Sequence, residues 1–265
     1  MIHKKDLENK VAIVTGSAGG IGKAIAKKLY SYGCNLVVSD IQTGKGEETA
    51  MLLGPRAIFI PCDISNIQQV NNLIEKSIER FGRLDIMINN AGINSSKPED
   101  RVTIDKYPDQ TWHDIINIDL NGTFYCCKAA AQKMVRQKTG SIVNLASVAG
   151  VVALRLQIGF VAAKAAIIKM TEAMACELAP FGIRVNAVSP GSTLTEQTRK
   201  LFYSESGSFS AMAERMISFI PQQRPGEADE IADAVAFLVS DEASYINGHN
   251  IIVDGGWTSG FNRDF

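Results

Sequence analysis

Residues 11–22 read VAIVTGSAGGIG, an apolar run that passes directly into spaced glycines. The first four residues are continuously apolar, which is typical of a strand buried on both faces. Gly16, Gly20 and Gly22 allow a tight turn and a close approach of the backbone, and the overlapping segment IGKAIAKKLY has apolar residues at helical spacing. A strand that turns into a helix in this way presents free N–H groups and the positive end of the helix dipole to an anion. The stretch predicts a nucleotide-phosphate site. Its spacing, G-x-x-x-G-x-G, departs from the usual G-x-G-x-x-G, so a plain glycine-rich loop is the alternative.

A second apolar run, Asn35 to Ser39, ends at Asp40, about twenty residues beyond the glycine loop. A carboxylate at this place accepts hydrogen bonds from both hydroxyls of an adenosine ribose and repels a 2′-phosphate. Asp40 therefore predicts NAD rather than NADP as the cofactor. The alternative is a solvated acid at the end of a strand.

Length and composition fit one enzyme-sized domain. The chain has 265 residues, of which 46% are hydrophobic, so we expect residues 1–265 to form a single NAD-binding domain. The net charge of −1 offers no basic surface for nucleic acid, which favours a small-molecule partner. The opening segment MIHKKDLENK leaves no room for an apolar signal region, and no run of 18 apolar residues follows, so we expect a cytoplasmic protein without a membrane partner. The five cysteines lack C-x-x-C spacing and the three histidines are scattered, which predicts no metal site.

Strand-like runs alternate with helical patterns along the whole chain. This alternation predicts an α/β fold, a Rossmann-type doubly wound parallel sheet of about seven strands with helices on both faces. Two helices look long, Gln110–Gln137 and Gly159–Ala179. The predicted strands are Val11–Thr15, Asn35–Asp40, Ala57–Pro61, Leu84–Asn89, Gly140–Ala146, Ile183–Val188 and Asn250–Val253.

Residues 193–223 differ in character, because the polar stretch Ser204–Ser208 interrupts a helical pattern. Segments that close over a ligand come from the less stable parts of a fold, so we expect a substrate lid here. An ordinary surface excursion is the alternative.

Several further motifs stand in register with the glycine loop, and together they carry a resemblance that covers essentially the whole chain. The chain resembles the short-chain dehydrogenases/reductases. The resemblance implies a seven-stranded Rossmann-type sheet, a nicotinamide cofactor and a homotetramer. The motifs are TGSAGGIG, Cys62-Asp63-Ile64, Asn89-Asn90-Ala91-Gly92, Ser147, Lys164, Pro190-Gly191 and Asp254-Gly255-Gly256.

The resemblance also implies roles for individual residues. Ser147 would hydrogen-bond the substrate oxygen, Lys164 would bind the nicotinamide ribose, and Thr195 would reach the nicotinamide carboxamide. Asp63 and Ile64 would hold the adenine. Turn-forming and helix-capping roles are the alternatives for the asparagines, the glycines and Asp63. The full set of expected cofactor contacts is Gly16, Ser17, Gly20, Ile21, Gly22, Asp40, Asp63, Ile64, Asn90, Ala91, Gly92, Lys164, Pro190, Gly191 and Thr195.

The sequence departs from the family at two catalytic positions. The family has Tyr thirteen residues after the active-site Ser and four before the Lys, and here that position holds Phe160. The family's fourth catalytic residue is an Asn before Leu-x-Gly, and here it is Asp119, in NIDLNGTF. Asn117 lies two residues away, so on a helix it points to a different side and is a poor substitute unless the backbone kinks.

The missing phenol removes a proton donor that contributes roughly 10²–10⁴ in rate. Three explanations follow. Phe160 is an engineered replacement, or it is native to a branch that routes the proton through Asp119, Lys164, Ser147 or water, or the protein no longer catalyses. The paired change at residue 119 favours the second explanation.

We therefore expect an NAD-dependent oxidoreductase that interconverts a secondary alcohol and a ketone. The polar lid and Arg155, which is placed to pair with a carboxylate or phosphate, favour a small polyol, sugar or sugar acid as substrate. A solvated loop arginine is the alternative for Arg155. Reduction of 3-oxoacyl thioesters and a catalytically silent NAD-binding protein are the alternative functions.

Overall fold

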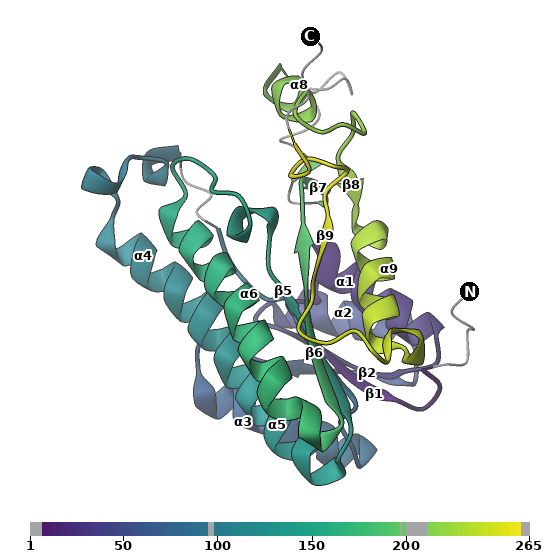
Figure 1. Ribbon diagram of the computed structural model, residues 1–265. Coiled ribbons are helices and arrows are strands. Elements are labelled where there is room, and N and C mark those ends of the chain that lie inside the picture. Colours follow the sequence, from purple (N-terminus) through teal and green to yellow (C-terminus); the bar gives the residue numbers. More distant parts are fainter. Residues whose placement is uncertain (1–6, 95–97, 197, 200–210, 261–265) are drawn as a thin grey trace.

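A seven-stranded parallel sheet organises the molecule (Figure 1). The computed structural model describes residues 7–94, 98–196, 198–199 and 211–260. The strand order is β3-β2-β1-β4-β5-β6-β9, and each neighbouring pair is parallel. The Rossmann-type fold expected from the sequence is thereby confirmed. The strands are β1 (Val11–Thr15), β2 (Asn35–Asp40), β3 (Ala57–Pro61), β4 (Ile86–Asn89), β5 (Gly140–Leu145), β6 (Ile183–Pro190) and β9 (Asn250–Val253).

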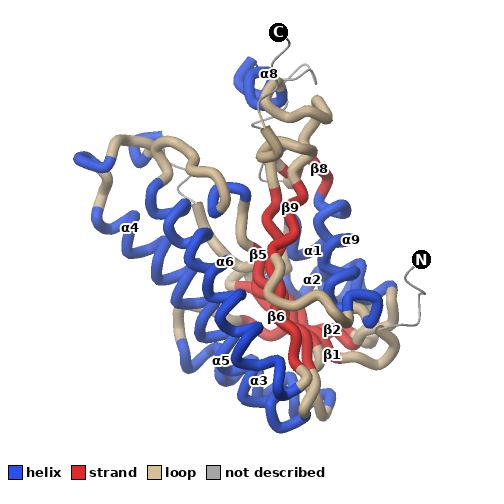
Figure 2. The backbone as a smooth tube through the Cα atoms, in the orientation of Figure 1, coloured by secondary structure: helices blue, strands red, loops and turns tan. Residues whose placement is uncertain are grey.

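Helices cover both faces of the sheet, as Figures 1 and 2 show. One hydrophobic core lies between the sheet and α1, α2 and α9, and a second lies between the sheet and α3, α5 and α6. Strands that are buried on both faces explain why their sequences are continuous apolar runs. The helices are α1 (Gly20–Ser31), α2 (Thr43–Leu53), α3 (Ile67–Phe81), α4 (Asp109–Ile115), α5 (Thr123–Gln137), α6 (Ile158–Leu178), α8 (Ala211–Ile217) and α9 (Ala228–Val239).

The strand order reverses between β1 and β4, and this reversal positions the site. Crossovers from β1 lead to one side of the sheet through β2 and β3, and those from β4 lead to the other. At such a switch point the loops at the carboxyl ends of the strands part and leave a crevice, where ligands of α/β sheets bind.

The expected helix Gln110–Gln137 is not a regular α-helix throughout. Between α4 and α5 the chain forms a π-helical turn, η3 (Ile116–Gly122). Gly122 packs on Ile64, so that a Cβ at residue 122 would lie 2.8 Å from the Ile64 Cδ1 atom. The wider turn buries Asp119 completely and leaves Asn117 exposed.

Only part of the expected lid, residues 193–223, is described. The short strands β7 (Thr193–Leu194) and β8 (Gly226–Glu227) pair with each other, and α8 lies between them in the sequence. Residue 197 and residues 200–210, which include the polar stretch Ser204–Ser208, lie outside the described residues. The lid therefore stays a prediction. Among the residues described, no helix has the length and apolar character to cross a membrane.

Candidate active site

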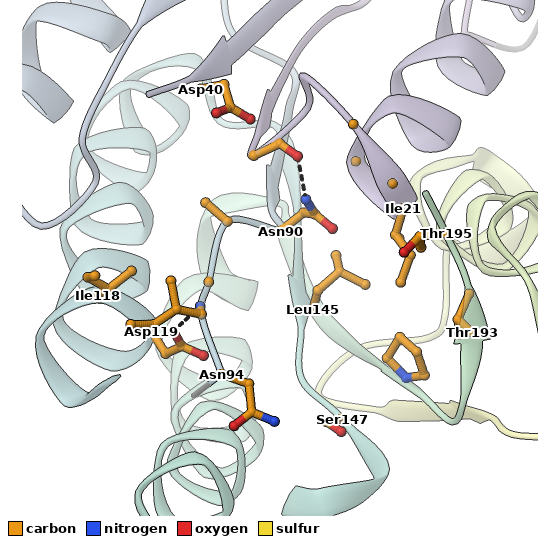
Figure 3. Close-up of a pocket in the computed structure, with 18 of the residues that line it drawn as sticks. Ile21, Asp40, Asn90, Asn94, Ile118, Asp119, Leu145, Ser147, Thr193 and Thr195 are labelled. Atoms are coloured by element: carbon orange, nitrogen blue, oxygen red, sulfur yellow. Dashed lines mark hydrogen bonds between the residues drawn. The ribbon is translucent and has the colours of Figure 1, made fainter. Parts of the chain in front are cut away.

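A cleft of about 710 Å³ opens at the carboxyl edge of the sheet, over the switch point (Figure 3). Its walls include the loops after β1, β2, β3, β4, β5 and β6. The cleft therefore brings together segments that are far apart in the sequence. Residues expected from the sequence that line it are Gly16, Gly20, Ile21, Gly22, Asp40, Asp63, Ile64, Asn90, Ala91, Gly92, Asp119, Ser147, Phe160, Lys164, Pro190, Gly191 and Thr195.

The glycine loop after β1 is fastened to the loop after β4. Gly16 has a φ of +63°, and a Cβ there would lie 2.8 Å from the Ala91 Cα atom. The Asn90 side-chain amide donates to the carbonyl oxygens of Thr15 and Gly16, each at 3.0 Å. A Cβ at Gly22 would collide with the Gly16 carbonyl oxygen. Gly20 has a φ of +53°, so all three predicted positions favour glycine, Gly16 and Gly20 for their backbone conformation and Gly22 for close packing.

The start of α1 is arranged to accept an anion. Its N-cap is Gly19, which offers no side chain to the first N–H groups of the helix. A Cβ at Gly19 would meet no atom of the described residues within 4 Å, so the backbone borders open space in the cleft. Free N–H groups at a helix N-terminus bind phosphate groups.

Ser17 and Asp40 have different relations to this loop. Ser17 is fully buried, donates to the Val14 carbonyl oxygen at 2.7 Å and accepts from the Ser39 N–H at 3.1 Å, so it braces the loop and does not line the cleft. Asp40 accepts from the Ala18 N–H at 3.0 Å and from the Gln42 N–H at 2.9 Å. These two bonds fix the Asp40 carboxylate at the cleft wall.

Asp63 is held in a local turn. One of its carboxylate oxygens accepts from the Ser65 N–H at 2.9 Å and from the Ser65 hydroxyl at 2.7 Å. The cap of α3 is Asn66, whose side chain accepts from two N–H groups of the first turn. Asp63 thus both shapes a turn and borders the cleft, and it is not the helix cap.

The other half of the cleft holds the residues for which the sequence resemblance implied catalytic roles. Ser147 follows β5, and its hydroxyl oxygen accepts from the Ala149 N–H at 3.1 Å. Gly150 packs directly on α6, where a Cβ would lie 2.6 Å from the Lys164 carbonyl carbon. The turn that carries Ser147 is therefore seated on the helix that carries Phe160 and Lys164.

Lys164 and Asp119 form a buried ion pair. The Lys164 Nζ atom lies 3.0 Å from Asp119 Oδ2 and donates to the Leu145 carbonyl oxygen at 3.3 Å. Asp119 Oδ1 accepts from the Ile93 N–H at 2.7 Å. The Nζ atom lies 5.4 Å from the centre of the Phe160 ring, within the range of a cation–π contact. Lys164 is 6% exposed and Asp119 is 0% exposed, so the two charges are shielded from water.

Asp119 Oδ2 lies close enough to Lys164 Nζ for an ion pair, but the angles between the two groups are not those of a hydrogen bond. This buried oxygen accepts no hydrogen bond from any residue in the described part of the chain. A Cβ at Gly92 would lie 3.0 Å from it, so glycine at residue 92 gives the carboxylate its room. Oδ2 is thus a buried acceptor whose contact in the described residues is the Lys164 ammonium.

The structure separates Arg155 from the site and adds residues that the sequence did not indicate. Arg155 is exposed and is not among the lining residues. Lys45, one turn into α2, lines the cleft near Asp40, and Asn94 and Met216 line it as well. Asn94 donates to the Gln157 side chain at 2.7 Å. Its place two residues after Asn90-Ala91-Gly92 is the only sequence signal that could have found it.

Comparison with known proteins agrees with this geometry. The profile of the family described as enoyl-(acyl carrier protein) reductase matches residues 16–258. The chain belongs to the short-chain dehydrogenase/reductase family. It is therefore an NAD(P)-dependent oxidoreductase, and the expected seven-stranded sheet is that of its family.

Relatives that are named for different activities match almost the full chain. A 3-oxoacyl-[acyl-carrier-protein] reductase of Synechocystis is 36% identical over 255 residues, covering 94% of this chain and 97% of the relative. An NAD-dependent glycerol dehydrogenase of Listeria innocua is 35% identical over 254 residues, covering 96% and 95%. The crystal structure of gox2181 has a TM-score of 0.89 at 33% identity and covers 96% of this chain and 98% of its own.

Proposed function

We propose that this short-chain dehydrogenase/reductase is NAD-dependent and interconverts a secondary alcohol and a ketone on a small polyol, sugar or sugar acid. The choice of NAD as cofactor rests on Asp40. Its carboxylate is 8% exposed, fixed by two backbone N–H groups and turned to the cleft. A 2′-phosphate beside it would place like charges together in a site with little water. The Listeria relative is named for NAD, which supports the same choice.

A bound nicotinamide supplies hydride exchange, and the chain supplies binding, orientation and the proton. We assign the phosphates to the start of α1 and the adenosine to Asp40, Asp63 and Ile64. Pro190, Gly191 and Thr195 line the cleft after β6 and would hold the carboxamide, with Thr195 beside Gly20 of the glycine loop. Ser147 would hold the substrate oxygen. These assignments follow the strand order, which sets the adenosine half at β2 and the nicotinamide half at β4 to β6.

Cofactor titration tests the first half of the proposal. NADH should bind at least about tenfold tighter than NADPH, since one like-charge contact is enough for that ratio. Asp40→Ala should reduce the difference in affinity between NADH and NADPH. Lys45→Ala is the matched control, because it removes the neighbouring cation and should not weaken the preference for NADH. Equal binding of NADPH and NADH by the parent protein would contradict the assignment.

The proposed substrate class rests on polar groups that line the cleft. Asn94 and Ser147 offer an amide and a hydroxyl, which suit a substrate that carries hydroxyl groups. A panel of glycerol, other polyols, sugar acids and an acetoacetyl thioester, each with its cofactor, is the test. Turnover confined to the thioester would overturn the choice of substrate and leave the oxidoreductase assignment standing.

We also propose a homotetramer. Helices α5 and α6 carry apolar residues that are not fully covered within one chain, among them Phe124, which is 46% exposed. Apolar faces of this kind are buried in symmetric assemblies. Light scattering on the purified protein gives the mass directly, and a monomer at micromolar concentration would contradict this proposal.

A further inference from the structure

The buried pair of Asp119 and Lys164 lies where the nicotinamide half of the cleft is expected, and the structure shows the two side chains as a direct ion pair. A buried ion pair of this kind is seldom a gain in stability over apolar side chains, because removing two charges from water is costly. Both residues border the cleft. We propose that Asp119 and Lys164 act as one acid–base unit: Lys164 exchanges the proton with the substrate oxygen, and Asp119 balances the charge of Lys164 and takes up or returns one of its protons. This inference rests on the proposed function.

The geometry supports a proton path through the pair. The Nζ atom lies 3.0 Å from Oδ2, and Oδ2 has no hydrogen bond within the described residues, so it has an open lone pair for a proton. Oδ1 is occupied by the Ile93 N–H, which fixes the carboxylate. The Phe160 ring, whose centre lies 5.4 Å from Nζ, offers no proton of its own.

The step balances. In alcohol oxidation the substrate O–H bond breaks and its proton bonds to Lys164 Nζ, while one Nζ proton bonds to Asp119 Oδ2. The pair ends as an ammonium beside a neutral carboxyl group. The hydrogen on carbon leaves with its electron pair for the oxidised cofactor, NAD⁺. In reduction the proton returns by the same path.

This assignment makes a prediction about charge that binding alone can test. The oxidised nicotinamide ring carries one positive charge more than the reduced ring. In the parent protein Asp119 offsets the Lys164 ammonium, so neither form should be strongly disfavoured. Asp119→Asn keeps an acceptor for the Ile93 N–H and leaves the ammonium unbalanced. The ratio of the dissociation constants, NAD⁺ to NADH, should rise by roughly tenfold.

Two further variants sharpen the experiment. Lys164→Met leaves Asp119 unbalanced and should lower the same ratio. Asn117→Asp is the matched control, because it adds a charge to the same π-helical turn at an exposed position and should leave the ratio within about twofold. Other charges that line the cleft are the same in all variants, so the change in the ratio isolates the pair.

The titrations use NAD⁺ and NADH as probes and need no substrate. A ratio in Asp119→Asn equal to that of the parent would overturn the inference, since the pair would then carry no charge at the nicotinamide. Failure to bind either form would instead contradict the proposed function. A second readout is chemical rescue of Lys164→Ala. Small primary amines should restore turnover of the best polyol in the panel, and the rescue should depend on the pKa of the amine. If amines fail to rescue Lys164→Ala and the NAD⁺ to NADH ratio of dissociation constants is unchanged in Asp119→Asn, Lys164 is not part of the proton path.

Discussion

Replacing Asp119 by Asn should destabilise the protein, by an amount that its contacts fix. The substitution keeps the bond from the Ile93 N–H, whose distance is 2.7 Å in the parent. What it removes is the charge that balances Lys164, which is 6% exposed. Breaking a buried pair by removing one partner costs about 3–5 kcal/mol. Lys164 keeps the Leu145 carbonyl oxygen at 3.3 Å and the Phe160 ring, so we place the loss at the lower end, about 3 kcal/mol.

Removing the other partner of the ion pair should destabilise the protein more. Lys164→Met leaves a fully buried carboxylate with one remaining hydrogen bond, which places the loss at about 4–5 kcal/mol. The double variant removes both charges. It should therefore lose less than the sum of the single variants, with a coupling free energy of about 2–3 kcal/mol.

Urea unfolding of the cofactor-free protein measures these free energies. Protein concentration has to be held constant, because an oligomer is stabilised by mass action. The midpoint should shift without a change in slope if only the folded state is affected. Asn117→Ala, on the exposed side of the same turn, should change stability by no more than about 0.5 kcal/mol. Additive losses in the double variant would refute the ion pair as the source of the effect.

Two other substitutions test the active site and the first turn of α9, where the Glu230 side chain accepts from the Glu227 N–H. Phe160→Tyr should change turnover by less than about tenfold if the ion pair carries the proton, whereas a gain of roughly 10²–10⁴ in a single-turnover assay would show that residue 160 is the proton site. Hydrogen bonds from Arg224 and from the Glu227 N–H lower the pKa of Glu230 to about 2, below its usual 4.5. A carboxyl group with a lowered pKa stabilises the fold above its unfolded pKa and loses that effect as pH falls through its folded pKa. Glu230→Gln should therefore lower the urea midpoint at neutral pH, and the difference from the parent should vanish near pH 2.

The fold was predictable because its signals are local. An apolar run, three glycines and a helical pattern stand within twenty residues of each other from Val11 to Tyr30, and the same alternation continues to β9. The register of Asp40 with the glycine loop follows from the pairing of β2 with β1. Residues that act through their place along one strand or turn are therefore visible in the sequence.

The remaining features depend on contacts between distant segments. Whether Asp119 or Asn117 points inward is decided by the π-helical turn, and that turn packs Gly122 on Ile64 from another part of the chain. Ser17 belongs to the predicted loop, but its hydroxyl faces β2 and is buried. No periodicity in the sequence contains these facts, because they depend on the packing of the finished sheet.

The substitutions at residues 119 and 160 are best understood together. A phenol at residue 160 would depend on an unbalanced Lys164 ammonium to lower its pKa, yet Asp119 balances that ammonium at 3.0 Å. Phe160→Tyr alone should therefore gain little, and Asp119→Asn alone loses the proton acceptor. The double variant restores both conditions at once: the ammonium is unbalanced and a phenol stands beside it. We expect its turnover to exceed that of Asp119→Asn by at least about tenfold, since the phenol supplies the positioned acid that Asp119→Asn lacks. A double variant as slow as Asp119→Asn would show that the two positions act independently, and single-turnover rates with saturating NAD⁺ distinguish the outcomes.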